Sequence, residues 1–306
     1  MNLSSSAPDD PVICRYKTEQ LIQLWQERYH MDVTRFFTGL TEVELRKSTE
    51  TSLAYFFPRS AAGDGPFYAV LQQEPWYYQT DKWEHRIALR EMAHARNILE
   101  VGCGAGAFLK QFLAAVPAGT RALGLELNEQ AIESARDSGL DVNNCPVEVF
   151  AAQHPAEFDV VCSFEVLEHV SHPEEFLAAS SHLLKPGGLL ITAVPNNASF
   201  ISKDLANFNI LNMPPHHLNL WTQQSLTNFL KRLGYTDIRF KFEHLQPIHV
   251  SWYASVLAQR FERLPWLLRR LVYNRPALKL IEAALNAGLR HLVRGHTMLA
   301  VARKNA

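Results

Sequence analysis

The chain has 306 residues, 47% of them hydrophobic, so it is long enough to bury a sizeable core and to hold one domain with additions. Its net charge of −1 argues against a general nucleic-acid-binding protein, which would carry a marked basic excess, and we expect no DNA partner. Residues 1–11 are polar, and no apolar run of the length that spans a bilayer occurs, which predicts a cytoplasmic protein.

Residues 1–90 differ in character from the rest of the chain. Helical spacing predicts a helix over 18–30, and the segment 55–83 is rich in aromatic residues. We interpret this region as a cap in front of a core that covers residues 91–245.

The segment 98–108 changes from an apolar run to three alternating glycines and then to apolar residues at helical spacing. The glycines are Gly102, Gly104 and Gly106. A loop that passes directly under a ligand needs positive φ angles and no Cβ between its amides and the bound group, so this loop predicts a nucleotide-like site. The spacing also fits the dinucleotide fingerprint with Glu126 as its acid, so spacing alone leaves a nicotinamide oxidoreductase open.

Short apolar segments alternate with helical segments from residue 98 onward. Buried strands are expected over 98–101, 121–127, 147–151, 159–164 and 189–194. Helices are expected over 108–116, 129–138 and 174–184. Strands separated by helices favour a parallel sheet that is covered on both faces.

The end of the chain carries a basic helical insertion over 246–295. A helix over 225–233, a strand over 237–242 and a last strand over 296–306 are expected around it. The insertion has two helical halves, split near residues 274–276, and residues 254–294 hold eight Lys or Arg against Glu262 and Glu282. We interpret the charges as a solvated helix face. Because apolar residues such as Trp252 and Trp266 lie beside these charges in the sequence, the alternative is that the insertion contacts a membrane surface or an anionic, lipid-linked substrate.

Glu100 ends the first strand of the core, and the segments 158–169 and 184–195 follow at orderly distances. With the glycine loop, they resemble the class I S-adenosylmethionine-dependent methyltransferases over about residues 85–245 and again at the end of the chain. The resemblance implies an α/β fold: a Rossmann-like seven-stranded methyltransferase sheet with helices on both faces, an N-terminal aromatic-rich cap and a helical insertion before an antiparallel last strand.

The same resemblance implies that S-adenosylmethionine lies over the glycine loop. Its expected contacts are Glu100, Gly102, Cys103, Gly104, Gly106, Glu126, Leu127 and Phe164. Glu126 would bind the ribose, because a carboxylate accepts two hydrogen bonds from a vicinal diol.

The front of the chain looks like that of a bacterial methyltransferase group whose members often carry a zinc ribbon held by two Cys-x-x-Cys pairs. This chain keeps only Cys14, with Lys17, Ser48 and Thr51 at the other three positions. One thiolate cannot hold a structural zinc, so we predict a metal-free remnant held by aromatic packing. In related proteins the segment that contains Tyr77, Tyr78 and Trp83 lies over the active site. The cysteines show no metal spacing, and Cys103 and Cys162 are expected to be buried, reduced and free of disulfides.

The segment 163–169 follows the fourth strand, where the resemblance implies the reacting centre. If the segment is helical, Glu165, Glu168 and His169 share one face and suit a divalent ion such as magnesium. The spacing resembles ubiquinone-pathway O-methyltransferases and small-RNA 2′-O-methyltransferases, where a metal held by Glu-x-x-Glu-His polarises the acceptor hydroxyls. His216 or His217 would supply the further histidine of the RNA enzymes. The alternative is a metal-free motif in which Glu168 is structural.

The predicted function is methyl transfer from S-adenosylmethionine to a hydroxyl of a small molecule, such as a sugar or a lipid-linked glycan. The protein must then align the acceptor, remove its proton and exclude water. His169 is the first candidate for the general base and His217 the second, with Glu165 beside them. The alternatives are a metal-assisted RNA 2′-O-methyltransferase and a non-catalytic scaffold with the cofactor fold. The segments after the fourth strand disfavour a nicotinamide enzyme, and the oligomeric state stays open.

Overall fold

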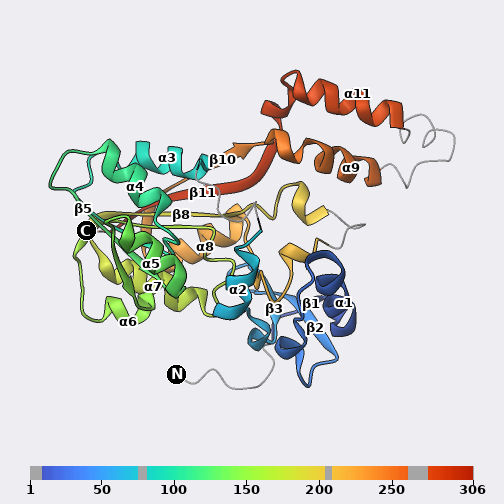
Figure 1. The fold of residues 1–306 in the computed structure, drawn as a ribbon, viewed down its shortest axis with the longest axis horizontal. Coiled ribbons are helices and arrows are strands. Elements are labelled where there is room, and N and C mark those ends of the chain that lie inside the picture. Colours follow the sequence, from blue (N-terminus) through green and yellow to red (C-terminus); the bar gives the residue numbers. More distant parts are fainter. Residues whose placement is uncertain (1–8, 75–80, 204–208, 261–274, 306) are drawn as a thin grey trace.

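A seven-stranded sheet forms the centre of the protein (Figure 1). The computed structural model describes residues 9–74, 81–203, 209–260 and 275–305. The strand order is β10-β11-β8-β7-β4-β5-β6. The strands are β4 (Asn97–Val101), β5 (Arg121–Glu126), β6 (Asp141–Asn144), β7 (Phe158–Phe164), β8 (Leu184–Pro195), β10 (Tyr235–His244) and β11 (Arg294–Lys304). The strands from β6 to β8 are parallel, and β11 runs antiparallel to both of its neighbours. The predicted Rossmann-like sheet is confirmed.

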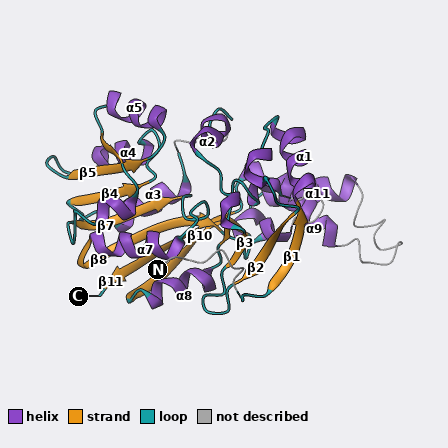
Figure 2. Ribbon diagram, turned by 90° about the horizontal axis from the view of Figure 1, so that it is seen from below, coloured by secondary structure: helices purple, strands orange, loops and turns teal. Residues whose placement is uncertain are grey.

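Helices cover both faces of this sheet (Figure 2). One face carries α3 (Trp83–Glu91), α4 (Ala107–Ala115) and α5 (Glu129–Asp137). The other carries α6 (Val147–Ala151), α7 (Pro173–Leu183) and α8 (Gln223–Arg232). Successive strand residues point to opposite faces: Ile98 packs with the first set and Leu99 with the second, and both are fully buried. A strand that is buried on both faces therefore reads as an unbroken apolar run.

The strand predicted over 147–151 is wrong, because these residues form helix α6. The third parallel strand is β6, six residues earlier, and the chain passes through Pro146 into the helix. Val147, Phe150 and Ala151 are buried at helical spacing, but a five-residue apolar run is too short for its period to separate a strand from a helix.

The N-terminal cap has its own antiparallel sheet. Its strands are β1 (Val12–Lys17), β2 (Glu42–Lys47), β3 (Ala54–Phe57) and β9 (Asn219–Leu220). Its helices are α1 (Thr18–Tyr29) and α2 (Gly65–Leu71), with short 3₁₀ turns η1 (Thr34–Phe37) and η2 (Arg59–Ala61), and α1 confirms the predicted helix. An aromatic core packs between them, including Trp25, Phe36, Phe56 and Phe67. Because β9 comes from the chain after β8, the cap is joined to the core by strand pairing.

The zinc-ribbon ancestry of the cap stays a prediction. Cys14 lies exposed on β1, and the turn between β2 and β3 is closed by the Thr51 N–H, which donates to Ser48 Oγ at 3.1 Å. Cys103 and Cys162 are buried, as predicted, and all four cysteines are free.

The insertion between β10 and β11 is helical, as predicted. It contains η5 (Pro247–His249), α9 (Val250–Arg260), α11 (Arg275–Asn286) and η7 (Leu289–Leu292). Figure 1 shows that α9 and α11 extend away from the sheet, with α11 on the outer side. Two further 3₁₀ turns, η3 (Phe200–Lys203) and η4 (Ile210–Asn212), follow β8. None of the helices in the described ranges is long and apolar enough to cross a bilayer.

Candidate functional site

A cavity of about 1220 Å³ lies at the carboxyl ends of the parallel strands. The strand order reverses at β4, which has β5 on one side and β7 on the other, and ligands of open α/β sheets bind at such a switch point. The volume exceeds the usual range for one small ligand, so the cavity has room for two molecules side by side.

The glycine loop forms one half of the cavity, which we call the cofactor half. Its glycines 102, 104 and 106 have φ angles of 74°, 53° and 77°. Seven of the eight predicted cofactor contacts line the cavity: Glu100, Gly102, Cys103, Gly104, Glu126, Leu127 and Phe164. Gly106 lies outside the lining. It precedes α4, and a Cβ there would come within 2.1 Å of Leu140 Cδ1, so its place is in the packing behind the loop.

Glu126 ends β5 beside the loop, and backbone amides hold both of its carboxylate oxygens. Gly104 N–H donates to Oε2 at 2.8 Å, and the amides of Leu127 and Asn128 donate to Oε1 at 2.8 and 2.9 Å. Glu100 lies deeper, where burial raises the pKa of its carboxyl well above the ordinary value. The carboxylate of Glu126 is therefore fixed at the edge of the cavity.

The segment after β7 is a turn, and the helix considered for it does not form. Glu165 takes a left-handed conformation with a φ of 55°, and His169 N–H donates to Val166 O at 2.9 Å. Backbone strain in a non-glycine residue marks a place that the surrounding structure holds tightly. The turn brings the carboxyls of Glu165 and Glu168 close enough to repel each other.

Among the described residues, Glu165 Oε1 and both Glu168 oxygens have no hydrogen bond of regular geometry, and the two carboxyls interact mainly with each other. Burial, followed by the charge of Glu168, raises the pKa of Glu165 well above its ordinary value. Burial raises the pKa of Glu168 to about 8. Buried polar atoms are almost always paired in folded proteins, so these oxygens point to a bound group.

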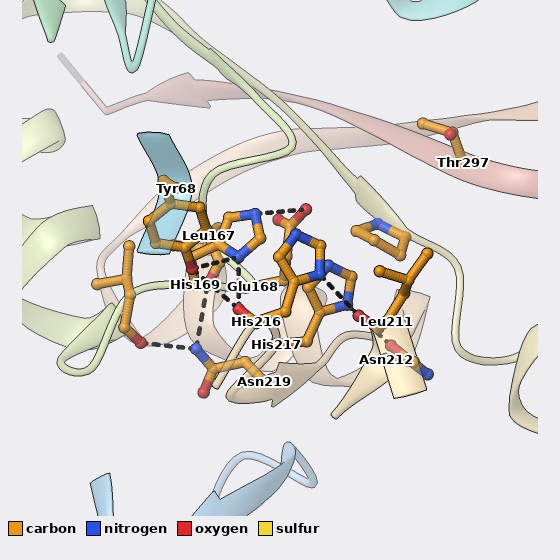
Figure 3. A network of polar contacts seen from close by, with 12 residues as sticks. Tyr68, Leu167, Glu168, His169, Leu211, Asn212, His216, His217, Asn219 and Thr297 are labelled. Carbon is orange, nitrogen blue, oxygen red and sulfur yellow. Dashed lines mark hydrogen bonds and ion pairs between the residues drawn. The ribbon is translucent and has the colours of Figure 1, made fainter. Parts of the chain in front are cut away.

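A second loop, over residues 212–219, lies against this turn (Figure 3). The amides of Leu218 and Asn219 donate to Glu168 O at 2.8 and 3.0 Å. Asn219 Nδ2 donates to the carbonyls of Leu167 and Val170 at 3.1 and 2.7 Å. The two segments, which are far apart in the sequence, thus form one hydrogen-bonded unit.

This unit brings three imidazoles together: His169 from the turn, and His216 and His217 from the loop (Figure 3). One ring nitrogen of each lies within 4.8 Å of the others. His169 Nδ1–H donates to His216 O at 2.7 Å, and His216 Nδ1–H donates to Leu211 O at 2.8 Å. Carbonyl oxygens only accept, so in both neutral rings the lone pair is left on Nε2.

Two side-chain amides orient His217 in the same way. Asn197 Nδ2 donates to Pro195 O at 3.3 Å, which directs its Oδ1 to Asn212 Nδ2 at 2.7 Å. Asn212 Oδ1 then accepts from His217 Nδ1–H at 3.0 Å. This amide relay also leaves the lone pair of His217 on Nε2.

All three rings are held neutral. Burial lowers the pKa of His169 to about 4. Burial first, and then the neighbouring imidazoles, lowers the pKa of His216 and of His217 well below the ordinary value. A neutral imidazole whose Nδ1–H is anchored on an oxygen is the usual state of a metal-binding histidine.

The cap contributes to this cluster through residues that sequence reasoning missed. Tyr68 Oη donates to His216 O at 3.1 Å and lies 3.2 Å from His169 Nδ1. Trp25 Nε1–H donates to Pro214 O at 3.0 Å. The Phe67–Tyr68 pair was visible only as part of an aromatic stretch, and no spacing in the sequence connects it with the histidines.

The far wall of the cavity was also missed. It contains Glu243 at the end of β10, His249 and Trp252 of the insertion, and His296 of β11. Burial raises the pKa of Glu243 to about 7 and lowers the pKa of His296 to about 3. The predicted Trp83 lines the cavity, whereas Tyr77 and Tyr78 fall outside the described residues. We call the histidine cluster and this wall the acceptor half.

Residues 62–239 match the family model of the methyltransferase domain. A ubiquinone biosynthesis O-methyltransferase of Methylococcus capsulatus is 31% identical over 186 residues, which cover 52% of this chain and 76% of that protein. The enzyme of the same name from Aromatoleum aromaticum is 39% identical over 107 residues, and the match covers 33% of this chain. That match spans 44% of the relative's length, less than half of it.

Solved structures share the fold at lower sequence identity. A SAM-dependent methyltransferase from Archaeoglobus fulgidus has a TM-score of 0.53 at 21% identity and covers 78% of this chain and 100% of its own. Haemonchus contortus phosphoethanolamine N-methyltransferase 2, in complex with S-adenosyl-L-methionine, has a TM-score of 0.52 at 12% identity and covers 95% of this chain and 76% of its own.

Proposed function

The chain belongs to the class I S-adenosylmethionine-dependent methyltransferases, and from that premise we propose that it transfers the methyl group to a hydroxyl of a small molecule. The observation that carries this proposal is one cavity with two unlike halves, a glycine loop on one side and three neutral imidazoles on the other. The names of the curated relatives support oxygen as the acceptor atom and ubiquinone biosynthesis, rather than a sugar or glycan, as the source of the substrate class.

The cofactor half would hold S-adenosylmethionine. The anchored carboxylate of Glu126 has lone pairs left for the ribose hydroxyls, and glycines 102 and 104 let the adenosyl-bearing ligand approach the main chain. The sulfonium already carries its activation, so the protein's contribution is alignment and the exclusion of water.

In the acceptor half, the hydroxyl must lose its proton. His169 offers a lone pair on Nε2, but a base whose pKa is lowered to about 4 removes a hydroxyl proton poorly at neutral pH. The low basicity favours the role of a neutral ligand over the role of a lone general base.

The donor set fits a divalent cation. The three imidazoles converge with their Nδ1–H groups anchored, and the unpaired Glu168 Oε1 lies 3.7 Å from His169 Nε2. Three nitrogen donors favour zinc or manganese over magnesium, which prefers oxygen ligands. When bound, such an ion lowers the pKa of an acceptor hydroxyl. We therefore propose His169, His216 and His217 as ligands, with Glu168 and Glu165 beside them. The charge of a bound cation would lower the raised pKa of Glu168, so that its carboxylate could take up the hydroxyl proton.

The cofactor is tested by calorimetric titration with S-adenosylhomocysteine. The wild type should bind it, and Glu126→Ala should weaken binding by about tenfold or more, since the ribose loses its acceptor. Glu129→Ala, at the exposed first residue of α5, is the matched control. Wild-type protein that binds NADH and no S-adenosylhomocysteine would contradict the assignment. Transfer of a labelled methyl group is then assayed on phenolic, sugar and RNA acceptors.

The metal is tested on chelator-treated protein titrated with Zn²⁺, Mn²⁺ and Mg²⁺. Zinc or manganese should bind at least about tenfold more tightly than magnesium, and His217→Ala should weaken that binding by about tenfold or more. His182→Ala, an exposed histidine near the end of α7, should leave it unchanged. Equal metal binding by the wild type and His217→Ala would reject this ligand set and leave His169 as a base without a metal.

A further inference from the structure

The helical insertion exposes a group of large apolar side chains. Nine such side chains are exposed in the described part of the chain, and four of them belong to the insertion. They are Ile248, Leu280, Leu289 and Leu292, with exposed fractions of 70%, 72%, 53% and 83%. A soluble protein seldom gathers its largest exposed apolar side chains on one element unless that element meets a partner.

Three of these side chains lie in the turns at one end of the insertion, Ile248 in η5 and Leu289 and Leu292 in η7, whereas Leu280 lies on α11. Leu245 N–H donates to Val293 O at 3.0 Å, and Arg290 Nη1 donates to Leu245 O at 3.4 Å. The turn η5 follows closely after Leu245, and η7 ends just before Val293. Ile248 and Leu292 therefore lie at the same end of the insertion. The apolar core of the insertion, which includes Leu285 and Val250, is buried separately from them.

The charge of the insertion is strongly positive. Residues 246–295 hold eight Lys or Arg and two Glu, a local charge of +6 in a chain with a net charge of −1. Among the described positions, Lys279, which precedes Leu280, and Arg294, two residues after Leu292, are exposed, and the guanidinium of Arg294 lies over the ring of Phe242 at 4.2 Å. We call these exposed residues of the insertion, Ile248, Lys279, Leu280, Leu289, Leu292 and Arg294, the hairpin face.

We propose that the hairpin face docks on an anionic lipid bilayer. Leucines flanked by basic residues bind the boundary between headgroups and acyl chains, where the apolar groups leave water and the cations meet lipid phosphates. An RNA partner would use the charges but leave the leucines in water. A second copy of the chain would bring two positive faces together across a two-fold axis.

The hairpin face lies next to the cavity, so docking through it would bring the cavity close to the bilayer. Ile248 belongs both to the face and to the lining of the cavity, and His249 and Trp252 continue that lining inward. Docking would therefore place this side of the cavity near the bilayer, where a lipophilic acceptor would be found. The docking itself goes beyond the proposed methyl transfer and does not depend on it.

Vesicle flotation of the full-length protein tests the proposal. Wild-type protein should float with vesicles of phosphatidylcholine and phosphatidylglycerol and stay unbound with phosphatidylcholine alone. Leu289→Asp/Leu292→Asp should weaken binding by at least about tenfold, and Lys279→Ala by about fivefold, the contribution of one basic side chain near an anionic surface. Val149→Asp, at an exposed apolar side chain of α6, is the matched control and should bind as the wild type does.

Titration with S-adenosylhomocysteine, which should be equal in all four proteins, separates loss of docking from loss of fold or of cofactor binding. Vesicle binding that is unchanged in the double variant would overturn the proposal. The proposal would also be overturned if the wild type does not bind anionic vesicles and light scattering shows that it forms a dimer that the double variant does not form. Flotation abolished by a single-stranded RNA competitor at an equal concentration of phosphates would also overturn it.

Discussion

The two halves of the cavity are built in opposite ways. The cofactor half comes mainly from one stretch of chain, residues 100–127, and holds its carboxylate with main-chain amides. The acceptor half is assembled from side chains of the cap, the turn after β7, the loop before β9, the insertion and β11. Main-chain geometry suits a ligand that every family member shares, whereas side chains on separate segments can vary with the acceptor. Variants that separate the two halves test this division.

Gly102 lies where the halves meet, and its substitution should have the largest effect. Its φ is +74°, and a Cβ there would come within 2.5 Å of Val166 Cγ2 in the turn that carries His169. Gly102→Val should weaken S-adenosylhomocysteine binding by at least about 100-fold, because the backbone strain at a positive φ and the displacement of the turn both act against binding. It should also reduce metal affinity. Calorimetry with each ligand measures both, and a loss confined to one ligand would show that the halves are not coupled through this contact.

Gly106 stands behind the cofactor half and should affect stability rather than binding. Gly106→Ala places a Cβ against Leu140 at a φ of +77° and should lower the free energy of unfolding by about 2 to 3 kcal/mol. Gly119→Ala is its control, because it has a φ of +86° with nothing near the added atom, and should cost about 1 kcal/mol. Urea unfolding measures both. Folded Gly106→Ala should bind S-adenosylhomocysteine as the wild type does. Weaker binding would show that Gly106 contributes to cofactor binding after all.

The same division explains what could be predicted from the sequence. The glycine loop and Glu126 are readable because local chain geometry forces those residue types at that spacing, and seven of the eight residues predicted there line the cavity. The five-residue run 147–151 was misread because its length hides its period. Glu165, Glu168 and His169 were grouped as a possible metal site, with His216 or His217 as a further ligand, but the grouping assumed a helix that does not form. Their meeting depends on Asn219 and on hydrogen bonds between distant segments, which no local pattern records.

Asn212 tests whether the acceptor half depends on the orientation of its side chains. Asn212→Ala removes the acceptor for His217 Nδ1–H and leaves Asn197 Oδ1 without its donor. Metal affinity should fall by about 10- to 100-fold, as when other partners that orient metal ligands are removed, while S-adenosylhomocysteine binding stays unchanged. Asn228→Ala, which removes a bond to Thr51 O elsewhere, is the control. Unchanged metal affinity would mean that the amide relay does not fix His217.

Asp159 lies outside both halves and should give the smallest effect, on stability alone. Its Oδ2 accepts from the amides of Arg96 and Asn97, both at 2.9 Å, and its Oδ1 contacts Lys185 Nζ at 2.6 Å. Despite partial burial, the bond from Lys185 and the two amides keep the pKa of this carboxyl below its ordinary value.

Because that pKa is lowered in the folded state, the bonds of Asp159 stabilise the protein above about pH 4, and their contribution is lost as the pH falls through the folded-state pKa. Asp159→Asn should cost about 1 kcal/mol at pH 7, a modest value because the site is partly exposed. The difference from the wild type should shrink as the pH falls below about 4. Urea unfolding at several pH values measures it, with Asp141→Asn on the edge strand β6 as the control for lost charge. A difference that stays constant as the pH falls below about 4 would show that the cost comes from packing, since removing a charge interaction must become harmless once the carboxyl is protonated.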